Sequence, residues 1–159
     1  MKIVKADFDP VTLEDELRVD TNCRQLLLEF YNHMTETGMA PDQATRLANG
    51  ADYFVRDFVV DVRRCNLFDE QPGLVWRFAG NWYIVNTLEP GIDELKNYLA
   101  GIAAFYRYLR DQGAISSEYC QVVEQECGLD EFYRQRIDDF WSISDDGYLA
   151  WEQACSLKD

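Results

Sequence analysis

The longest helical pattern in the chain is Glu89-Pro-Gly-Ile-Asp-Glu-Leu-Lys-Asn-Tyr-Leu-Ala-Gly-Ile-Ala-Ala-Phe-Tyr-Arg-Tyr-Leu-Arg-Asp-Gln-Gly113. Six apolar residues recur in it at spacings of three and four, which places them on one face of a helix: Ile92, Leu95, Leu99, Ile102, Tyr106 and Leu109. Pro90 suits the first turn, and Gly113 can adopt the left-handed conformation that ends a helix. An apolar stripe of this length has to be buried, so residues 89–113 predict the central core helix.

Further helices are predicted on both sides of this segment from N-cap residues, apolar spacing and glycine stops. They cover residues 21–38, 40–64, 116–128 and 129–141, with a terminal amphipathic segment around Leu149, Trp151 and Cys155. Gly50 lies inside the second of these helices, where glycine lowers helix stability. We therefore expect a kink or an unusually close helix contact at Gly50.

Residues 74–85, Leu-Val-Trp-Arg-Phe-Ala-Gly-Asn-Trp-Tyr-Ile-Val, are the hardest segment to assign. Their aromatic and β-branched residues favour a strand, but apolar residues also recur at spacings of three and four. Because the sequence shows no partner strand elsewhere, we predict a helix here.

These patterns together predict an all-α fold, a single-domain bundle of about six to eight helices built from helical hairpins. The domain covers residues 1–159, of which 1–20 form an N-terminal arm and a short helix, and 21–159 form the helical body. The short helix is predicted from the capping-box pattern Thr12-Leu-Glu-Asp15.

Composition indicates an acidic, water-soluble protein. Lysine and arginine total 15 against 29 aspartate and glutamate residues, a net charge of −14 that repels duplex DNA and anionic membranes. No apolar run approaches the roughly 20 residues that cross a bilayer, and the N-terminus does not resemble a signal peptide. Five cysteines without metal-ligand spacing favour free thiols. We therefore expect a cytoplasmic protein that uses no cofactor or metal.

Two segments share the pattern F-Y-x-x-(M/L)-x-x-x-G, residues 30–38 and 105–113, and a new helix start follows each. This pattern resembles the helical core-binding (SAM-like) domain of tyrosine recombinases, over residues 22–64 and 88–127. Residues 78–83 and 105–109 also resemble uncharacterised bacterial helical proteins. The recombinase resemblance implies a DNA-associated role, but the chain has no catalytic domain and its charge has the wrong sign for clamping DNA.

The chemistry-bearing residues form no recognisable catalytic motif. His33 is the only histidine, and no nucleophile motif accompanies it. Cys120 and Cys127 are two helical turns apart, too far to bind one ion without other ligands. The segment around Asp145 and Gly147 lacks the closing glutamate of a calcium loop. An enzyme, acting through carboxylates such as Asp138 and Asp139 or through an acquired metal, is therefore the less favoured interpretation.

We predict instead a non-catalytic helical module that binds another protein. Tryptophan and tyrosine often anchor protein interfaces, and the chain has more aromatic residues than one helix pair needs. The predicted binding residues are Trp82, Tyr83, Tyr98 and Tyr108. The alternative, a DNA-associated accessory domain, would use a basic path of Arg63, Arg64, Arg107 and Arg110. The sequence does not determine the partner or the oligomeric state.

Overall fold

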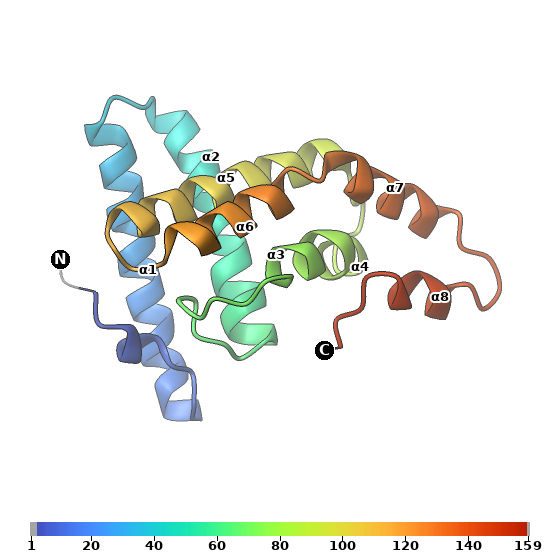
Figure 1. The fold of residues 1–159 in the computed structure, drawn as a ribbon, viewed down its shortest axis with the longest axis horizontal. Helices are drawn as coiled ribbons and strands as arrows, with labels where there is room; N and C mark the ends of the chain where they lie inside the picture. Colours follow the sequence, from blue (N-terminus) through green and yellow to red (C-terminus); the bar gives the residue numbers. More distant parts are fainter. Residues whose placement is uncertain (1–2, 159) are drawn as a thin grey trace.

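The computed structural model describes residues 3–158 and is all-α, with no strand in that range (Figure 1). Residues 1, 2 and 159 of the predicted domain lie outside the described residues. The elements are η1 (Lys5–Phe8), α1 (Leu13–Glu36), α2 (Pro41–Asp52), η2 (Tyr53–Val62), α3 (Leu74–Arg77), η3 (Phe78–Trp82), α4 (Tyr83–Val85), α5 (Ile92–Asp111), α6 (Ser117–Cys127), α7 (Asp130–Trp141) and α8 (Tyr148–Gln153). Since α2 continues into η2, and α3, η3 and α4 are consecutive, the described residues form seven helices besides the single turn of η1. The predicted fold class is confirmed.

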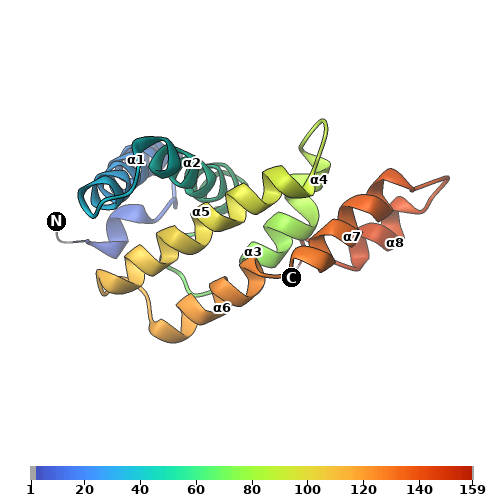
Figure 2. The same cartoon turned by 90° about the horizontal axis from the view of Figure 1, so that it is seen from above.

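Helix α5 lies at the centre of the bundle, as the sequence predicts. Viewed from above, α1 and α2 lie on one side of it and α6 on the other, while α7 and α8 project at one end (Figure 2). Five residues of the predicted stripe are buried, and Ile92, in the first turn, is half-buried against the core. The helix starts at Ile92, so Pro90 precedes it and does not occupy its first turn.

Two glycines allow α2 and α5 to approach until their backbones touch. A Cβ atom on Gly50 would lie 2.9 Å from the Cα atom of Tyr98, and one on Gly101 would lie 2.2 Å from the carbonyl oxygen of Leu47. The close contact expected at Gly50 is confirmed. Gly101 has the complementary role on α5, and the sequence analysis missed it.

Segments η2 and η3 are π-helical, with N–H groups bonding to carbonyls five residues back. The bond from Arg63 N–H to the Phe58 carbonyl, 2.8 Å long, shows this pattern at the end of η2. The helix predicted for residues 74–85 is confirmed, but the π geometry in its middle was not predicted. Helix periodicity does not distinguish a π turn from an α turn over so few residues.

The N-terminal region differs from the prediction. Helix α1 is continuous from Leu13 to Glu36, so the expected boundary between residues 20 and 21 does not coincide with a helix end. The predicted capping box is present, with the Thr12 hydroxyl accepting from Asp15 N–H and the Asp15 carboxylate accepting from Thr12 N–H. Buried Val19 and Cys23 carry the apolar face across the expected break.

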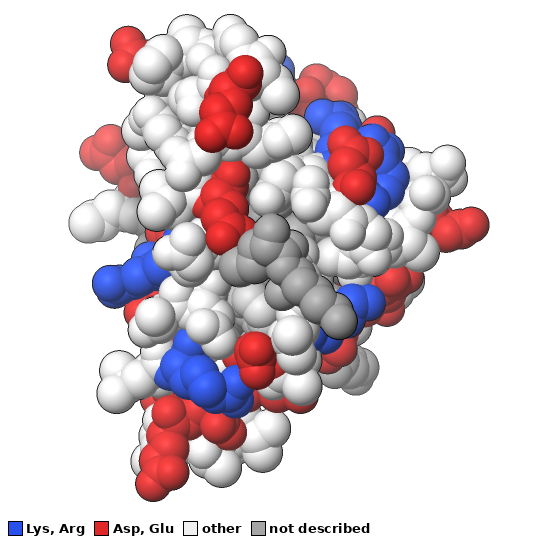
Figure 3. Space-filling model, turned by 90° about the vertical axis from the view of Figure 1, so that its left-hand side faces the viewer, with Lys and Arg blue, Asp and Glu red and all other residues white. Residues whose placement is uncertain are grey.

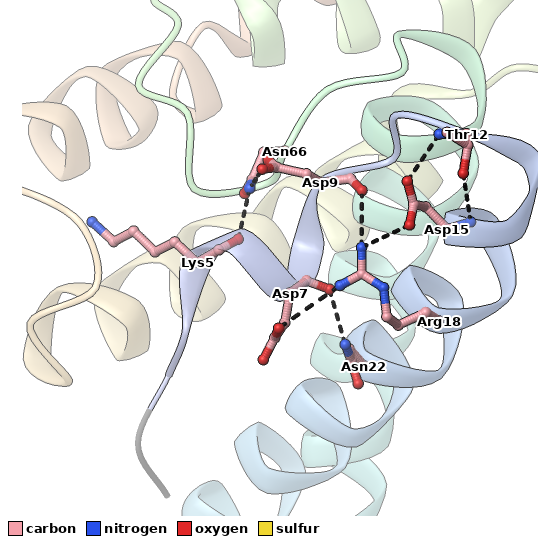
Figure 4. Close-up of polar contacts among 8 residues, drawn as sticks. All are labelled: Lys5, Asp7, Asp9, Thr12, Asp15, Arg18, Asn22 and Asn66. Carbon is pink, nitrogen blue, oxygen red and sulfur yellow. Dashed lines mark hydrogen bonds and ion pairs between the residues drawn. The ribbon is translucent and has the colours of Figure 1, made fainter.

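The segment before α1 is folded onto the body by polar contacts (Figure 4). Asn66 donates to the Lys5 carbonyl at 2.8 Å and to Asp9 Oδ1 at 2.6 Å. Asn22 of α1 donates to the Asp7 carbonyl at 2.9 Å. In place of a free arm, residues 5–8 therefore form the short helix η1, whose Phe8 is buried.

Helices α7 and α8 dock on η3 through a buried arginine. Arg136 Nε donates to the Gly80 carbonyl at 2.8 Å, and its guanidinium stacks 3.9 Å from the centre of the Trp151 ring. Asn81, also buried, donates to Glu152 Oε2 at 3.0 Å and to the Cys155 carbonyl at 2.8 Å. Polar side chains thus fasten the last helices to the bundle.

Candidate functional site: an aromatic surface at two π-helical segments

Three half-buried aromatic side chains meet where η2, η3 and α5 come together. The Tyr53 ring centre lies 5.4 Å from that of Trp82 and 5.1 Å from that of Tyr98. We call these three residues the aromatic trio. Each keeps part of its side chain exposed, while buried Phe58 and Phe78 contact the trio from the core side. Aromatic rings with one face packed and one edge in water are typical of contact surfaces.

The close crossing of α2 and α5 positions the trio. Because Gly50 has no Cβ, the end of α2 lies against the backbone at Tyr98. Tyr53 follows Gly50 by less than one helical turn, so its ring reaches that of Tyr98. Burial raises the pKa of both phenols above the ordinary value.

Tyr83, predicted as a binding residue, is fully buried. Its hydroxyl donates to Glu94 Oε1 at 2.7 Å and accepts from Gly91 N–H at 3.1 Å. Burial raises the pKa of Tyr83 well above its usual value. Tyr83 therefore holds the loop between α4 and α5 in place and does not present its ring to a partner.

The loop anchored by Tyr83 adds apolar surface beside the trio. Leu88 in this loop is 93% exposed, and Val85, the last residue of α4, is 40% exposed. Thr87, next to Leu88, lies near enough to Tyr53 to oppose the rise in the pKa of that phenol. We call the trio together with Val85 and Leu88 the aromatic surface. Glu89, exposed in the same loop, gives its edge a negative charge.

Tyr108 lies elsewhere. Near the C-terminal end of α5 its ring packs against α1, 5.5 Å from Phe30 and 5.1 Å from the exposed His33. The structure therefore brings together Trp82, Tyr83 and Tyr98 and separates Tyr108 from them. Tyr53 also belongs to this surface, and it was not predicted from the sequence. Its position three residues after Gly50, where a close helix contact is expected, is the sequence feature that could have identified it.

The four arginines of the nucleic-acid alternative form two separate pairs. Arg63, just after η2, donates to the Leu157 carbonyl at 2.6 Å, and Arg64 pairs with Glu16. Arg107 and Arg110 face α6, where both approach Glu124, at 3.5 and 3.7 Å. On the face that includes the side of α1, the basic areas are small and acidic side chains border them (Figure 3). The arrangement gives no continuous basic path.

Within residues 3–158, no group of three or more histidine, cysteine, aspartate or glutamate side chains could hold a metal ion. All five cysteines are free thiols. No helix in this range combines the length and hydropathy required to cross a bilayer.

No protein-family model, curated protein or solved structure matches the chain.

Proposed function

We propose that the chain is a non-catalytic, acidic helical module that binds another protein through the aromatic surface. The observation that carries this proposal is the meeting of the half-buried Tyr53, Trp82 and Tyr98 rings, with Leu88, 93% exposed, in the loop that follows α4. Tryptophan and tyrosine are among the side chains that most often anchor interfaces, and covering an exposed leucine removes apolar area from water.

The charge of the chain favours a basic partner. With a net charge of −14, long-range attraction would speed the approach of a positively charged protein and oppose that of nucleic acid. The same proposal places the chain in the cytoplasm, since five free cysteines are typical of a reducing compartment. The DNA-associated alternative has less support, because its four arginines are divided between two sites and face acidic or carbonyl oxygens.

A photo-crosslinking residue at position 88 tests the proposal in living cells. We expect a discrete crosslinked protein, and we expect Leu88→Asp to lower affinity for that protein by at least about tenfold, as loss of an interface anchor does. Leu149→Asp is the matched control, because Leu149 is also exposed, at 64%, but lies on α8. No crosslink from position 88, together with unchanged partner capture by Leu88→Asp, would overturn the proposal.

A further inference from the structure

The outer side of α1 carries leucines that no other described element covers. Leu13 and Leu17 are 79% and 78% exposed, and Leu28 is 51% exposed. Their spacings of four and eleven residues place them on one stripe of the helix, beside the face that enters the core. Large apolar side chains gathered on one side of a helix indicate a contact surface, here in two parts, because polar Thr21 and Arg24 separate Leu17 from Leu28.

The stripe forms one wall of a groove between α1 and the antiparallel helix α2–η2. Two hollows lie along it. One, about 230 Å³, has Leu28 and Tyr31 on the α1 side and Ala48 on α2. The other, about 270 Å³, has Leu17 on the α1 side and Val60 on η2. We call both hollows and the ridge between them the α1 groove.

An ion-pair network forms the ridge. Arg56 Nε lies 2.8 Å from Asp20 Oδ1, and Arg56 Nη1 lies 3.0 Å from Asp52 Oδ1. Arg24 Nε lies 3.1 Å from the other Asp20 oxygen. These ion pairs join α1 to α2–η2. They also neutralise Arg24 and Arg56, the two cations at the middle of the groove.

Two carboxylates at one end of the groove have no cation of their own. Asp57 and Asp61, which we call the acidic pair, line the second hollow, and neither forms an ion pair with any residue from 3 to 158. The two arginines that also line this hollow are bound by Asp20, Asp52 and Glu16. Partial desolvation in the hollow, with the negative charge of neighbouring aspartates, raises the pKa of Asp57 although nearby Arg56 opposes the rise. An incoming lysine or arginine would relieve this repulsion.

We propose that the α1 groove binds a basic amphipathic helix of a partner protein. Its apolar side would cover Leu17, Leu28 and Tyr31, and its lysines or arginines would pair with Asp57 and Asp61. From Leu13 to Leu28 the stripe spans about 22 Å at 1.5 Å per residue, which matches a helix of about four turns. Helices that bind in grooves use anchors at spacings of three, four and seven residues.

A second copy of the chain is a poor occupant for the same groove. A second copy carries the same net charge of −14, and the first turn of α1 adds Glu14, Asp15 and Glu16, so electrostatic repulsion opposes self-association at this groove. The charge of the groove selects a partner of opposite sign.

This inference is independent of the aromatic surface, because the two sites use different side chains. The π-helix η2 borders both: Tyr53 contributes to the aromatic surface and Asp57 to the α1 groove. Variants of Leu88 and of Leu17 therefore test the two proposals separately.

The test uses the full chain and a fluorescent peptide of about 16 residues, long enough for four helical turns. In this peptide, leucines recur at spacings of three and four and lysines fill the other positions. We expect micromolar binding by fluorescence anisotropy at 0.15 M salt, and no binding of the same peptide with glutamate in place of lysine. Leu17→Asp should weaken binding at least about tenfold, whereas Leu88→Asp should leave it unchanged.

The double variant Asp57→Asn with Asp61→Asn should also weaken binding at least about tenfold. Its matched control is Asp138→Asn with Asp139→Asn, which removes the same charge from the exposed side of α7 and should change affinity less than twofold. Equal losses in the two double variants would show non-specific attraction and overturn the proposal. So would a concentration-dependent dimer that Leu17→Asp dissociates, because the groove would then hold a second copy. Far-UV circular dichroism of each variant verifies the fold.

Discussion

The crossing of α2 over α5 and the docking of α7 and α8 on η3 join helices by opposite means. At the crossing, Gly50 and Gly101 remove side chains so that two backbones touch. At the docking site, Arg136 and Asn81 add long polar side chains that reach carbonyl oxygens. We therefore expect the crossing to be sensitive to substitutions that add atoms. We expect the docking site to be sensitive to substitutions that remove hydrogen bonds.

The difference follows from where each contact lies. The crossing is at the centre of the bundle, where buried apolar area supplies most of the stability and any misfit spreads through packed neighbours. The docking site lies toward the end of the molecule, where α7 keeps an exposed outer side and hydrogen bonds determine how the last segment is held. We expect disruption of the first to unfold the bundle and disruption of the second to act locally.

The largest effect is expected from Gly101→Ala. The new Cβ would lie 2.2 Å from the Leu47 carbonyl oxygen, a backbone atom that cannot turn away, so α2 and α5 would have to separate. We expect a loss of about 3 kcal/mol in the free energy of unfolding, measured by urea denaturation, at the upper end of ordinary overpacking costs. Gly91→Ala is the control, because a Cβ there meets nothing within 4 Å. A loss below about 1 kcal/mol for Gly101→Ala would show that the crossing is not tightly packed.

An intermediate effect is expected from Arg136→Met. The substitution leaves the Gly80 and Trp151 carbonyls without their donors, 2.8 and 2.5 Å away in the native protein, and removes the stack on Trp151. The expected cost is about 2 kcal/mol, as for lost hydrogen bonds to a charged group. Amide hydrogen exchange should accelerate in residues 148–157 but not in α5.

Arg134→Met controls for the change of charge, since Arg134 is on the same helix but its side chain is 46% exposed. Equal acceleration of exchange in α5 and α8 by Arg136→Met would contradict a local role for Arg136.

The smallest effect concerns pH. Burial alone would raise the pKa of Glu152, but hydrogen bonds from Leu157 N–H, the Ser156 hydroxyl and Asn81 lower it below the ordinary 4.5. A carboxylate whose pKa is lowered by folding stabilises the folded state above its ordinary pKa, and this contribution is lost as the pH falls through the folded value. We therefore expect residues 154–157 to loosen below about pH 4.5 while α2 and α5 remain packed.

Backbone amide chemical shifts in an NMR titration would follow this change, with Leu157 N–H as the reporter. Glu152→Gln should abolish the titration of that amide below pH 4.5. Glu131→Gln, at a side chain 87% exposed on α7, should leave it intact. If the amide shifts of α5 and of residues 154–157 changed together as the pH falls, the crossing and the docking site would not respond to pH independently.

The sequence predicts the parts of the fold that depend on local pattern. The stripe on α5 and the turns at Gly38 and Gly113, with φ of 106° and 74°, are set by residues close together in the chain. The π segments and the role of Gly101 could not be predicted, because they depend on which helix packs against them. Arg136 is similar: an arginine in a charged helix is ordinarily exposed, and its burial requires Gly80 and Trp151, far away in sequence.

The candidate site was predicted in part. Trp82 and Tyr98 were identified by residue type and do lie close together, each beside Tyr53. Residue type alone could not separate Tyr83, which is buried, from Tyr98, which is half-exposed. Residue type alone also could not place Tyr108 against α1. The side of α5 that meets α1 depends on how the whole bundle is assembled.

The fastening of both terminal segments to one loop has a mechanical consequence. Asn66 holds the Lys5 carbonyl and Arg63 holds the Leu157 carbonyl, so the two attachments are three residues apart in the chain. If residues 5 and 157 were pulled apart, the force would act on these two hydrogen bonds first. It would act on the helices of the bundle only after they had broken. The first event under force would therefore be the peeling of a terminal segment, with the central bundle still folded.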